Sequence, residues 1–240
     1  MADEAVRPAL IGNRWVLVGG IFYLLEWVAI IGAGVVGVNE TAGVGTSPQE
    51  ILDSYSGHVD AVAFMAGWFA LVLLGRVLVF VGLRSALADS GRSHLLMDFA
   101  VVASAVSVTL EVAAYGVAAA AADLADAQDT TAMVILDRAG GWLNQLLEGG
   151  LAVAIVCSAW CMWRSRLFSM PLNVLGAVAG IGIVFAQLSI APSLATLFAI
   201  LGFSVPLFWI WMLWAGVVLW RHTPKTGSSD ASVVPEVAAG

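Results

Sequence analysis

The chain has 240 residues, of which 60% are apolar and 11% are charged, whereas soluble domains average about 45–50% and about 25%. This composition excludes an ordinary soluble globular domain and indicates a membrane protein. The chain has only ten Lys and Arg residues, so it has no basic stripe to neutralise phosphates. We therefore expect no nucleic-acid partner.

Six segments are mostly apolar over about 20 residues, the length that crosses a bilayer as an α-helix. The sequence therefore predicts an all-α fold, a polytopic membrane bundle of six transmembrane helices in contact with the lipid bilayer. We expect residues 1–222 to form this six-helix transmembrane domain and residues 223–240 to form a flexible cytoplasmic tail. The predicted spans are residues 15–38, 59–83, 95–122, 141–163, 171–190 and 197–220.

The loop charges predict the orientation, because Lys and Arg accumulate on the cytoplasmic side. In a six-span arrangement one side carries Arg7, Arg14, Arg84, Arg92, Arg164, Arg166, Arg221 and Lys225, and the other carries Arg138 alone. We therefore expect a multi-pass protein of the cell membrane, here the inner membrane of a bacterium. Both termini should be cytoplasmic. The acidic side should include a loop around residues 123–129, and its carboxylates are Glu40, Glu50, Asp53, Asp60, Asp123, Asp126, Asp129 and Asp137.

A short helix is predicted between the first two spans. Ser47, Pro48 and Glu50 form a capping box with proline at the first helical position. Ile51 and Tyr55 then fall on one helical face, so we expect a helix on the surface of the acidic side.

Four charged residues lie deep inside predicted spans, far from the span ends, where a charge costs at least about 2.5 kcal/mol and is normally turned inward. They are Glu26, Arg76, Glu111 and Glu148. With a rise of about 1.5 Å per residue, all four reach one layer about 12–24 Å from the basic end. Polar residues at helical spacing accompany them, so the predicted binding or proton-relay set is Glu26, Arg76, Glu111, Tyr115, Asn144, Gln145 and Glu148.

The charge balance of this layer predicts that it binds protons or a cation. Three carboxylates and one guanidinium sum to a formal charge of −2, and a low-dielectric site responds by binding protons or by recruiting a cation. We expect at least one glutamate to be protonated in the empty protein. In the alternative interpretation, Arg76 and two glutamates form a buried salt-bridge network that only fixes helix packing.

Few cofactors are compatible with the sequence. The three histidines lie at span ends, which leaves no axial pair for haem, and the only lysine, Lys225, is in the tail, which excludes a retinal Schiff base. Cys157 and Cys161 have no histidine or carboxylate at ligand spacing. We expect no cofactor, no metal site and no catalytic residue. His94 and Asp98 are predicted to pair at the membrane surface.

The last two spans carry further patterns. Gly176 and Gly180 form a GxxxG motif, for which we expect internal packing rather than dimerisation. Pro206 interrupts the sixth span, and the tryptophans after it would either present aromatic faces to an organic cation or contact lipid. These tryptophans are Trp209, Trp211 and Trp214.

Several stretches resemble a family of bacterial six-helix membrane proteins that is catalogued as a domain of unknown function. They are residues 164–176 (RSRLFSMPLNVLG), the Gly180-Ile181-Gly182 run, the Leu213-Trp214-Ala215-Gly216 close, and residues 60–87 with Gly82-Leu83-Arg84. The resemblance implies a six-helix topology and no activity.

Three function classes remain open. The first is a proton- or cation-linked carrier or a binder of a small amphiphile, which would use the acidic layer and a small cationic or amphiphilic ligand. The second is a non-catalytic accessory or assembly subunit of a larger membrane complex, or a homo-oligomer. The third is an intramembrane enzyme, against which stands the absence of a nucleophile with its base.

Overall fold

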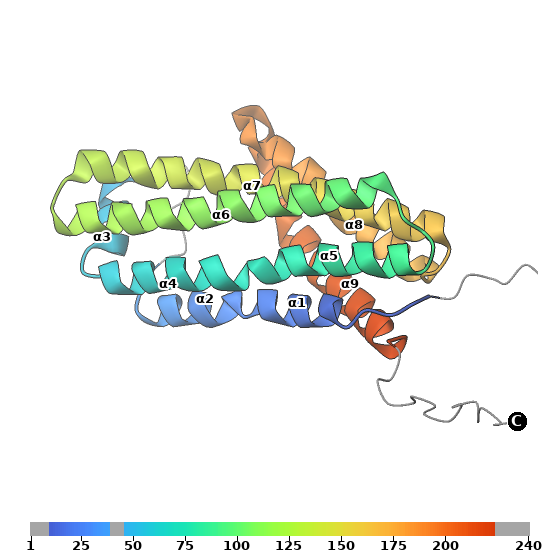
Figure 1. The fold of residues 1–240 in the computed structure, drawn as a ribbon. Helices are drawn as coiled ribbons and strands as arrows, with labels where there is room; N and C mark the ends of the chain where they lie inside the picture. Colours follow the sequence, from blue (N-terminus) through green and yellow to red (C-terminus); the bar gives the residue numbers. More distant parts are fainter. Residues whose placement is uncertain (1–9, 39–45, 224–240) are drawn as a thin grey trace, which may run out of the picture.

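The computed structural model describes residues 10–38 and 46–223, and within these ranges the chain is helical without any β-strand (Figure 1). Most of the predicted tail and the residues Arg7, Glu40 and Lys225 lie outside them. The helices are α1 (Trp15–Leu24), α2 (Glu26–Val35), α3 (Pro48–Tyr55), α4 (Val59–Val72), α5 (Leu74–Asp89), α6 (Leu95–Asp126), α7 (Thr130–Ser165), α8 (Met170–Gln187), η1 (Leu188–Ile190), η2 (Pro192–Ile200) and α9 (Leu201–Arg221).

Among the described residues, six helical segments are long and apolar enough to span a membrane, which confirms the predicted all-α fold and the number of candidate spans. Two of them combine two α-helices each, and the last joins η2 to α9. The segments are Trp15–Val35, Val59–Asp89, Leu95–Asp126, Thr130–Ser165, Met170–Ile190 and Ser193–Arg221.

The third and fourth spans are longer than the sequence predicts. Helices α6 and α7 have 32 and 36 residues, or about 48 and 54 Å, against an apolar bilayer thickness of about 30 Å. The predicted acidic loop around residues 123–129 is therefore wrong for residues 123–126, which belong to α6, and the helix that contains the predicted fourth span begins at Thr130 rather than at 141. Only Ala127–Asp129 separates the helices, because the alanine-rich end of α6 favours helix and Asp129 caps α7 by accepting from Ala132 N.

The predicted surface helix is confirmed as α3. Ser47 and Glu50 form both hydrogen bonds of the capping box, and Ile51 and Tyr55 are buried against the α6–α7 hairpin. Tyr55 donates a 2.8 Å hydrogen bond to Oδ1 of Asp137, which lies buried within α7 rather than in a loop. Helix α3 thus fastens the projecting hairpin to the bundle.

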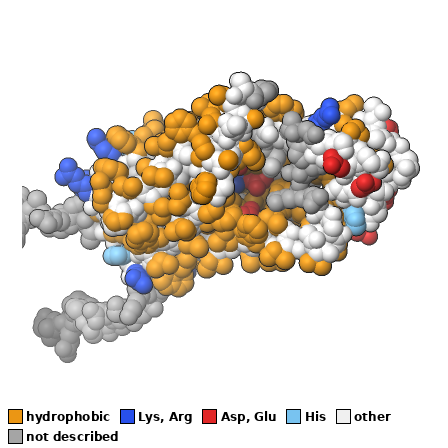
Figure 2. Space-filling model, turned by 180° about the vertical axis from the view of Figure 1, so that it is seen from behind, with side chains coloured by type: hydrophobic (Ala, Val, Ile, Leu, Met, Phe, Trp, Pro, Cys, Tyr) orange, Lys and Arg blue, Asp and Glu red, His pale blue; other side chains and the backbone are white. Residues whose placement is uncertain are grey.

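The described ends of the chain lie together at one end of the bundle. Gly12 N donates to His222 O at 3.2 Å, and Ile11 N donates to Oγ of Ser90, which follows α5. Figure 2 shows most Lys and Arg side chains at this end and most Asp and Glu side chains at the other. The two ends of the bundle therefore carry opposite charge, and we call them the basic and the acidic end.

Two of the spans are interrupted although neither has a proline near the break. Helix α1 ends before Leu25, where Leu25 N and Val28 N bond carbonyls three residues back instead of four. The indole N–H of Trp68 also donates to Leu25 O at 2.8 Å, and a side chain inserted into the helical ladder is a known cause of such a break. The break between α4 and α5 falls at Leu73. Each break lies within three residues of a buried charged residue. Glu26 follows the break at Leu25, and Arg76 follows the break at Leu73.

Close glycine contacts position the helices around these breaks. A Cβ atom on Gly75 would lie 2.5 Å from the carbonyl oxygen of Gly19, so the backbones of α1 and α5 touch. On α8, a Cβ on Gly176 would meet Trp211, and one on Gly180 would meet Val156. Both glycines of the GxxxG motif thus pack inside the chain, as predicted.

Helix α9 crosses the bundle obliquely behind the other helices (Figure 1). It packs along α1 and α8. The N-terminal end of α9, which follows η2, therefore diverges from α2. The sixth span is also the most exposed, since only 11% of its most apolar window is buried.

Candidate functional site

A cavity of about 210 Å³ lies between α1/α2 and α9, over the middle of α6 and α7. Its volume is large enough for several water molecules or a small organic molecule. Figure 2 shows acidic and basic atoms at the bottom of a hollow in the apolar side of the bundle. The lining residues are Tyr23, Glu26, Trp27, Ile30, Arg76, Glu111, Tyr115, Asn144, Leu147, Glu148, Leu151, Val205 and Trp209.

An ion pair between α5 and α6 forms one wall. Nη2 of Arg76 donates to Oε2 of Glu111 at 2.5 Å and to Oγ of Ser107 at 3.2 Å. Ser107 in turn donates to the carbonyl of Leu147 on α7 at 2.8 Å. The guanidinium, the carboxylate and the hydroxyl therefore connect three helices and hold their charged groups in fixed positions.

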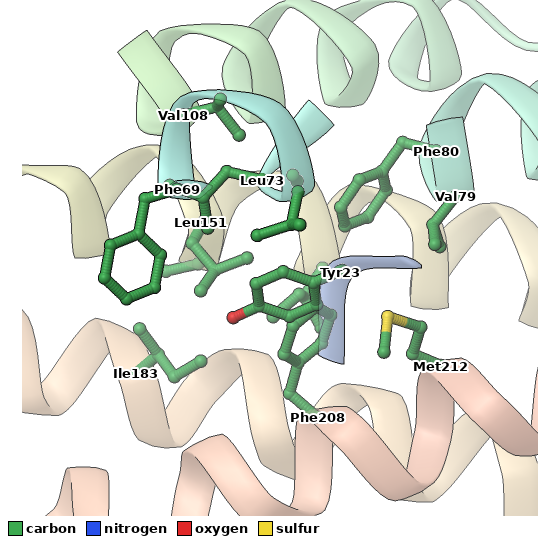
Figure 3. Packing of buried hydrophobic residues seen from close by; sticks show 14 of the residues in the cluster. Tyr23, Phe69, Leu73, Val79, Phe80, Val108, Leu151, Ile183, Phe208 and Met212 are labelled. Atoms are coloured by element: carbon green, nitrogen blue, oxygen red, sulfur yellow. The ribbon is translucent and has the colours of Figure 1, made fainter. Parts of the chain in front are cut away.

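Arg76 is also enclosed by Tyr23 of α1. The guanidinium carbon lies 5.3 Å from the centre of the Tyr23 ring, a cation–π distance, and Arg76 is only 1% exposed. Figure 3 shows Tyr23 packed beside Phe208 and Leu73, with its hydroxyl pointing away from Met212. Because the Gly19–Gly75 contact brings α1 against α5, the ring and the guanidinium are in van der Waals reach.

Two further carboxylates line the same cavity, those of Glu26 and Glu148. Glu26 is 5% exposed at the start of α2, and Glu148 lies on α7 one turn from Asn144. Oε2 of Glu148 is buried and has no hydrogen-bond partner among the described residues. Three carboxyl groups and one guanidinium thus share one space, so the cavity has an acidic excess whenever more than one carboxyl is ionised.

Aromatic rings form the outer wall. Trp27 of α2 and Trp209 of α9 meet edge to face, with ring centres 5.3 Å apart and planes at 85°. Deeper in the bundle, Phe69 stacks on Tyr115 at 4.0 Å. The cavity therefore combines carboxylates with π faces, the two groups that attract an organic cation.

The structure brings six of the seven predicted binding or relay residues to this cavity, namely Glu26, Arg76, Glu111, Tyr115, Asn144 and Glu148. Gln145 does not line it, because a step of one residue turns a side chain about 100° around the helix. Two further polar residues of α6, Ser104 and Ser107, lie toward the basic end from Glu111 and are fully buried.

Sequence reasoning missed the apolar and aromatic part of the lining. Trp27, Ile30 and Val205 have no polar signal, and their role depends on how α9 crosses α2. Of the tryptophans after Pro206, Trp209 lines the cavity. Trp211 is fully buried, and Trp214 is 41% exposed.

Metal-binding geometry is not found in the described residues, where no group of three or more His, Cys, Asp or Glu side chains could hold an ion. The three glutamates of the cavity are thus too dispersed to surround one cation together.

Comparisons with protein-family models, with curated proteins and with solved structures give no match for this chain.

Proposed function

We propose that this protein is a multi-pass membrane protein that binds a small amphiphilic cation in the acidic cavity and couples it to protons, as a proton- or cation-linked carrier or binder. The observation that supports the proposal most strongly is Glu148, whose Oε2 is buried and without a partner in a cavity that holds two other carboxyl groups. Arg76 is already paired with Glu111. A cation or a proton would therefore give the Oε2 atom of Glu148 the partner that it lacks.

The walls of the cavity favour an organic cation. The aromatic pair of Trp27 and Trp209 and the side chains of Ile30 and Val205 form an apolar rim above the carboxylates. The hollow in Figure 2 opens on the apolar side of the bundle. A ligand with an apolar body and a positive head would thus enter from the bilayer and place its charge against Glu148.

The helix interruptions support coupling to a conformational change. Breaks at Leu25 and Leu73 separate the acidic-end halves of two spans from their basic-end halves. Interrupted helices with charged residues at the break are typical of carrier binding sites. We propose that these breaks allow the cavity to change its access while the Gly19–Gly75 contact stays closed.

Binding can be tested with benzyltrimethylammonium and its uncharged carbon analogue neopentylbenzene, which have the same shape. The purified protein should be stabilised against thermal unfolding by the cation and much less by the analogue, because only the cation neutralises the carboxylates. Glu148→Gln should abolish the difference. Asp123→Asn is the matched control, since Asp123 is an exposed carboxylate of α6 outside the cavity. Equal stabilisation of native protein by both compounds would contradict the proposal.

The same account includes an orientation. We propose that the basic end faces the cytoplasm of a bacterial cell, so that both termini are cytoplasmic, because Arg14, Arg84, Arg92 and Arg164 are at that end. Cysteine accessibility in intact cells would test it: a cysteine introduced at Ser169 should be protected from an impermeant maleimide, and one introduced at Gln128 should react.

A second candidate function is that of an accessory subunit or a homo-oligomer. It is favoured by the sixth span, because only 11% of its most apolar window is buried within the chain and such a helix has a large surface for another protein. Co-purification of a stoichiometric partner, or a dimeric mass in detergent, would support it. A monodisperse monomer that binds the cation would favour the first proposal.

A further inference from the structure

A second cavity, of about 250 Å³, lies at the basic end between the α5–α6 turn and the last turn of α7. It is separate from the acidic cavity and shares no lining residue with it. Arg92, Ser93 and His94 line it from the turn, and Arg164 and Ser165 line it from α7.

Backbone hydrogen bonds fix the turn that carries Arg92, Ser93 and His94. Gly91 adopts a positive φ of 70°, which ends α5 and lets Arg92 N bond the carbonyl of Leu87 at 2.7 Å. His94 then caps α6, since its Nδ1 accepts from Leu96 N at 3.2 Å. A ring whose Nδ1 accepts carries its proton on Nε2 when it is neutral, so His94 keeps one N–H donor for another partner.

The charge of this cavity is entirely positive. Neither Arg92 nor Arg164 has a carboxylate partner among the described residues, where the ion pairs are Arg76–Glu111 and Arg84–Asp98. No acidic side chain lines the cavity. The predicted pairing of His94 with Asp98 is wrong, because Asp98 bonds Arg84 instead. Two guanidinium groups therefore share a concave site with further N–H and O–H donors.

We propose that this cavity binds one phosphate group, either that of an anionic lipid headgroup or a free phosphate ion. Arginine presents several N–H donors in a planar fork, and two such forks match the several oxygens of a phosphate. The positive end of the 32-residue helix α6 adds to the same field. The proposal is independent of the function proposed for the acidic cavity.

The surroundings are those of a lipid headgroup. Leu95 is 80% exposed directly after His94, and Trp160 and Trp163 are 53% and 43% exposed within one turn of Arg164. Exposed tryptophans beside arginines at the end of an apolar span mark the membrane–water interface. A lipid whose phosphate is held here would have room for its acyl chains along α6 and α7.

The test compares three probes on the purified full chain: inorganic phosphate, dioctanoylphosphatidate, and dioctanoylglycerol, which has the same chains without phosphate. Thermal unfolding and native mass spectrometry report binding. We expect dioctanoylphosphatidate to raise the unfolding temperature and dioctanoylglycerol to leave it nearly unchanged. An equal shift with inorganic phosphate would assign the site to the free ion, and a shift with the lipid alone would assign it to a headgroup.

The variant Arg92→Gln/Arg164→Gln should lower the affinity for the phosphate probe at least tenfold. Both side chains are exposed, so the variant should fold, and its unfolding temperature without probe checks this. Arg221→Gln is the matched control, because Arg221 is an exposed arginine at the same end that does not line the cavity. Equal affinity of the double variant and the control, or an equal shift with dioctanoylglycerol, would overturn the proposal.

Discussion

The indole N–H of Trp68 donates a 2.8 Å hydrogen bond to the carbonyl oxygen of Leu25, at the point where α1 ends and α2 begins. A side chain of the second span thus holds open the helical ladder of the first, one residue before Glu26. This contact links the shape of the first span to the position of a cavity carboxylate.

The first prediction concerns this link. Trp68→Phe removes the donor and should lower the free energy of unfolding by about 1 kcal/mol. It should also weaken benzyltrimethylammonium binding several-fold, because Glu26 would lose its fixed position. Trp142→Phe, on an exposed tryptophan of α7, is the control. Identical affinities for these two variants would show that the break has no role in binding.

The second prediction concerns the buried ion pair. Arg76→Gln should destabilise the protein by about 3 kcal/mol, because it leaves Glu111 without its partner in a buried site. The double variant Arg76→Gln/Glu111→Gln should recover part of that loss, since it removes the orphaned charge. A double-mutant cycle on thermal unfolding measures this coupling, and additive effects of the two changes would argue against it.

The third prediction concerns the crossing of α1 and α5. Gly75→Ala places a methyl group 2.5 Å from Gly19 O and 2.6 Å from Tyr23 N, both backbone atoms that cannot turn away. We expect a loss of about 1–3 kcal/mol from overpacking and a lower affinity for benzyltrimethylammonium. Gly67→Ala is a matched control, because a Cβ there meets nothing within 4 Å. A Gly75→Ala protein as stable as Gly67→Ala would disprove the close contact.

The fourth prediction uses Tyr55 at the acidic end. Burial, followed by the adjacent Asp137 carboxylate that accepts its hydrogen bond, raises the pKa of Tyr55 well above its ordinary value of 10.0. The folded state therefore favours the neutral phenol. Below pH 10 the phenol of Tyr55 is neutral in both states, and its contribution to the free energy of unfolding is complete. Above pH 10 the unfolded chain loses a proton that the folded chain keeps, so the free energy of unfolding falls.

Tyr55→Phe should consequently lower the unfolding temperature at pH 8, where the hydrogen bond is lost. It should also flatten the decline between about pH 10 and pH 11, the range above the ordinary tyrosine pKa. Thermal unfolding across this pH range measures both effects. An equally steep decline in both proteins would mean that Tyr55 does not titrate differently in the folded state.

Much of the fold could be predicted because its signals are local. The capping box from Ser47 to Glu50 depends on four consecutive residues, and apolar length alone identifies the six candidate spans. The layer of Glu26, Arg76, Glu111 and Glu148 followed from counting residues along each helix, since the rise per residue is constant. The helical spacing of Asn144 and Glu148 also placed both on one face, whereas Gln145 points elsewhere.

The rest depends on contacts between helices. The break at Leu25 coincides with a hydrogen bond from Trp68, which is 43 residues away in the chain. Trp27 meets Trp209 only because α9 crosses obliquely. The lengths of α6 and α7 were underestimated, because a span was expected to end where its apolar run ends. The polar start of α7 is instead capped by Asp129 and packs on α3 through the hydrogen bond of Tyr55 with Asp137.

The central claim is that Glu148 binds either a proton or the organic cation, so that the acidic cavity exchanges one for the other. The most direct test reconstitutes the protein in liposomes that contain a pH dye and imposes a gradient of benzyltrimethylammonium across the membrane. We predict a change of internal pH with the native protein and with Asp123→Asn, and none with Glu148→Gln or with empty liposomes. A response of Glu148→Gln equal to that of the native protein would contradict the claim.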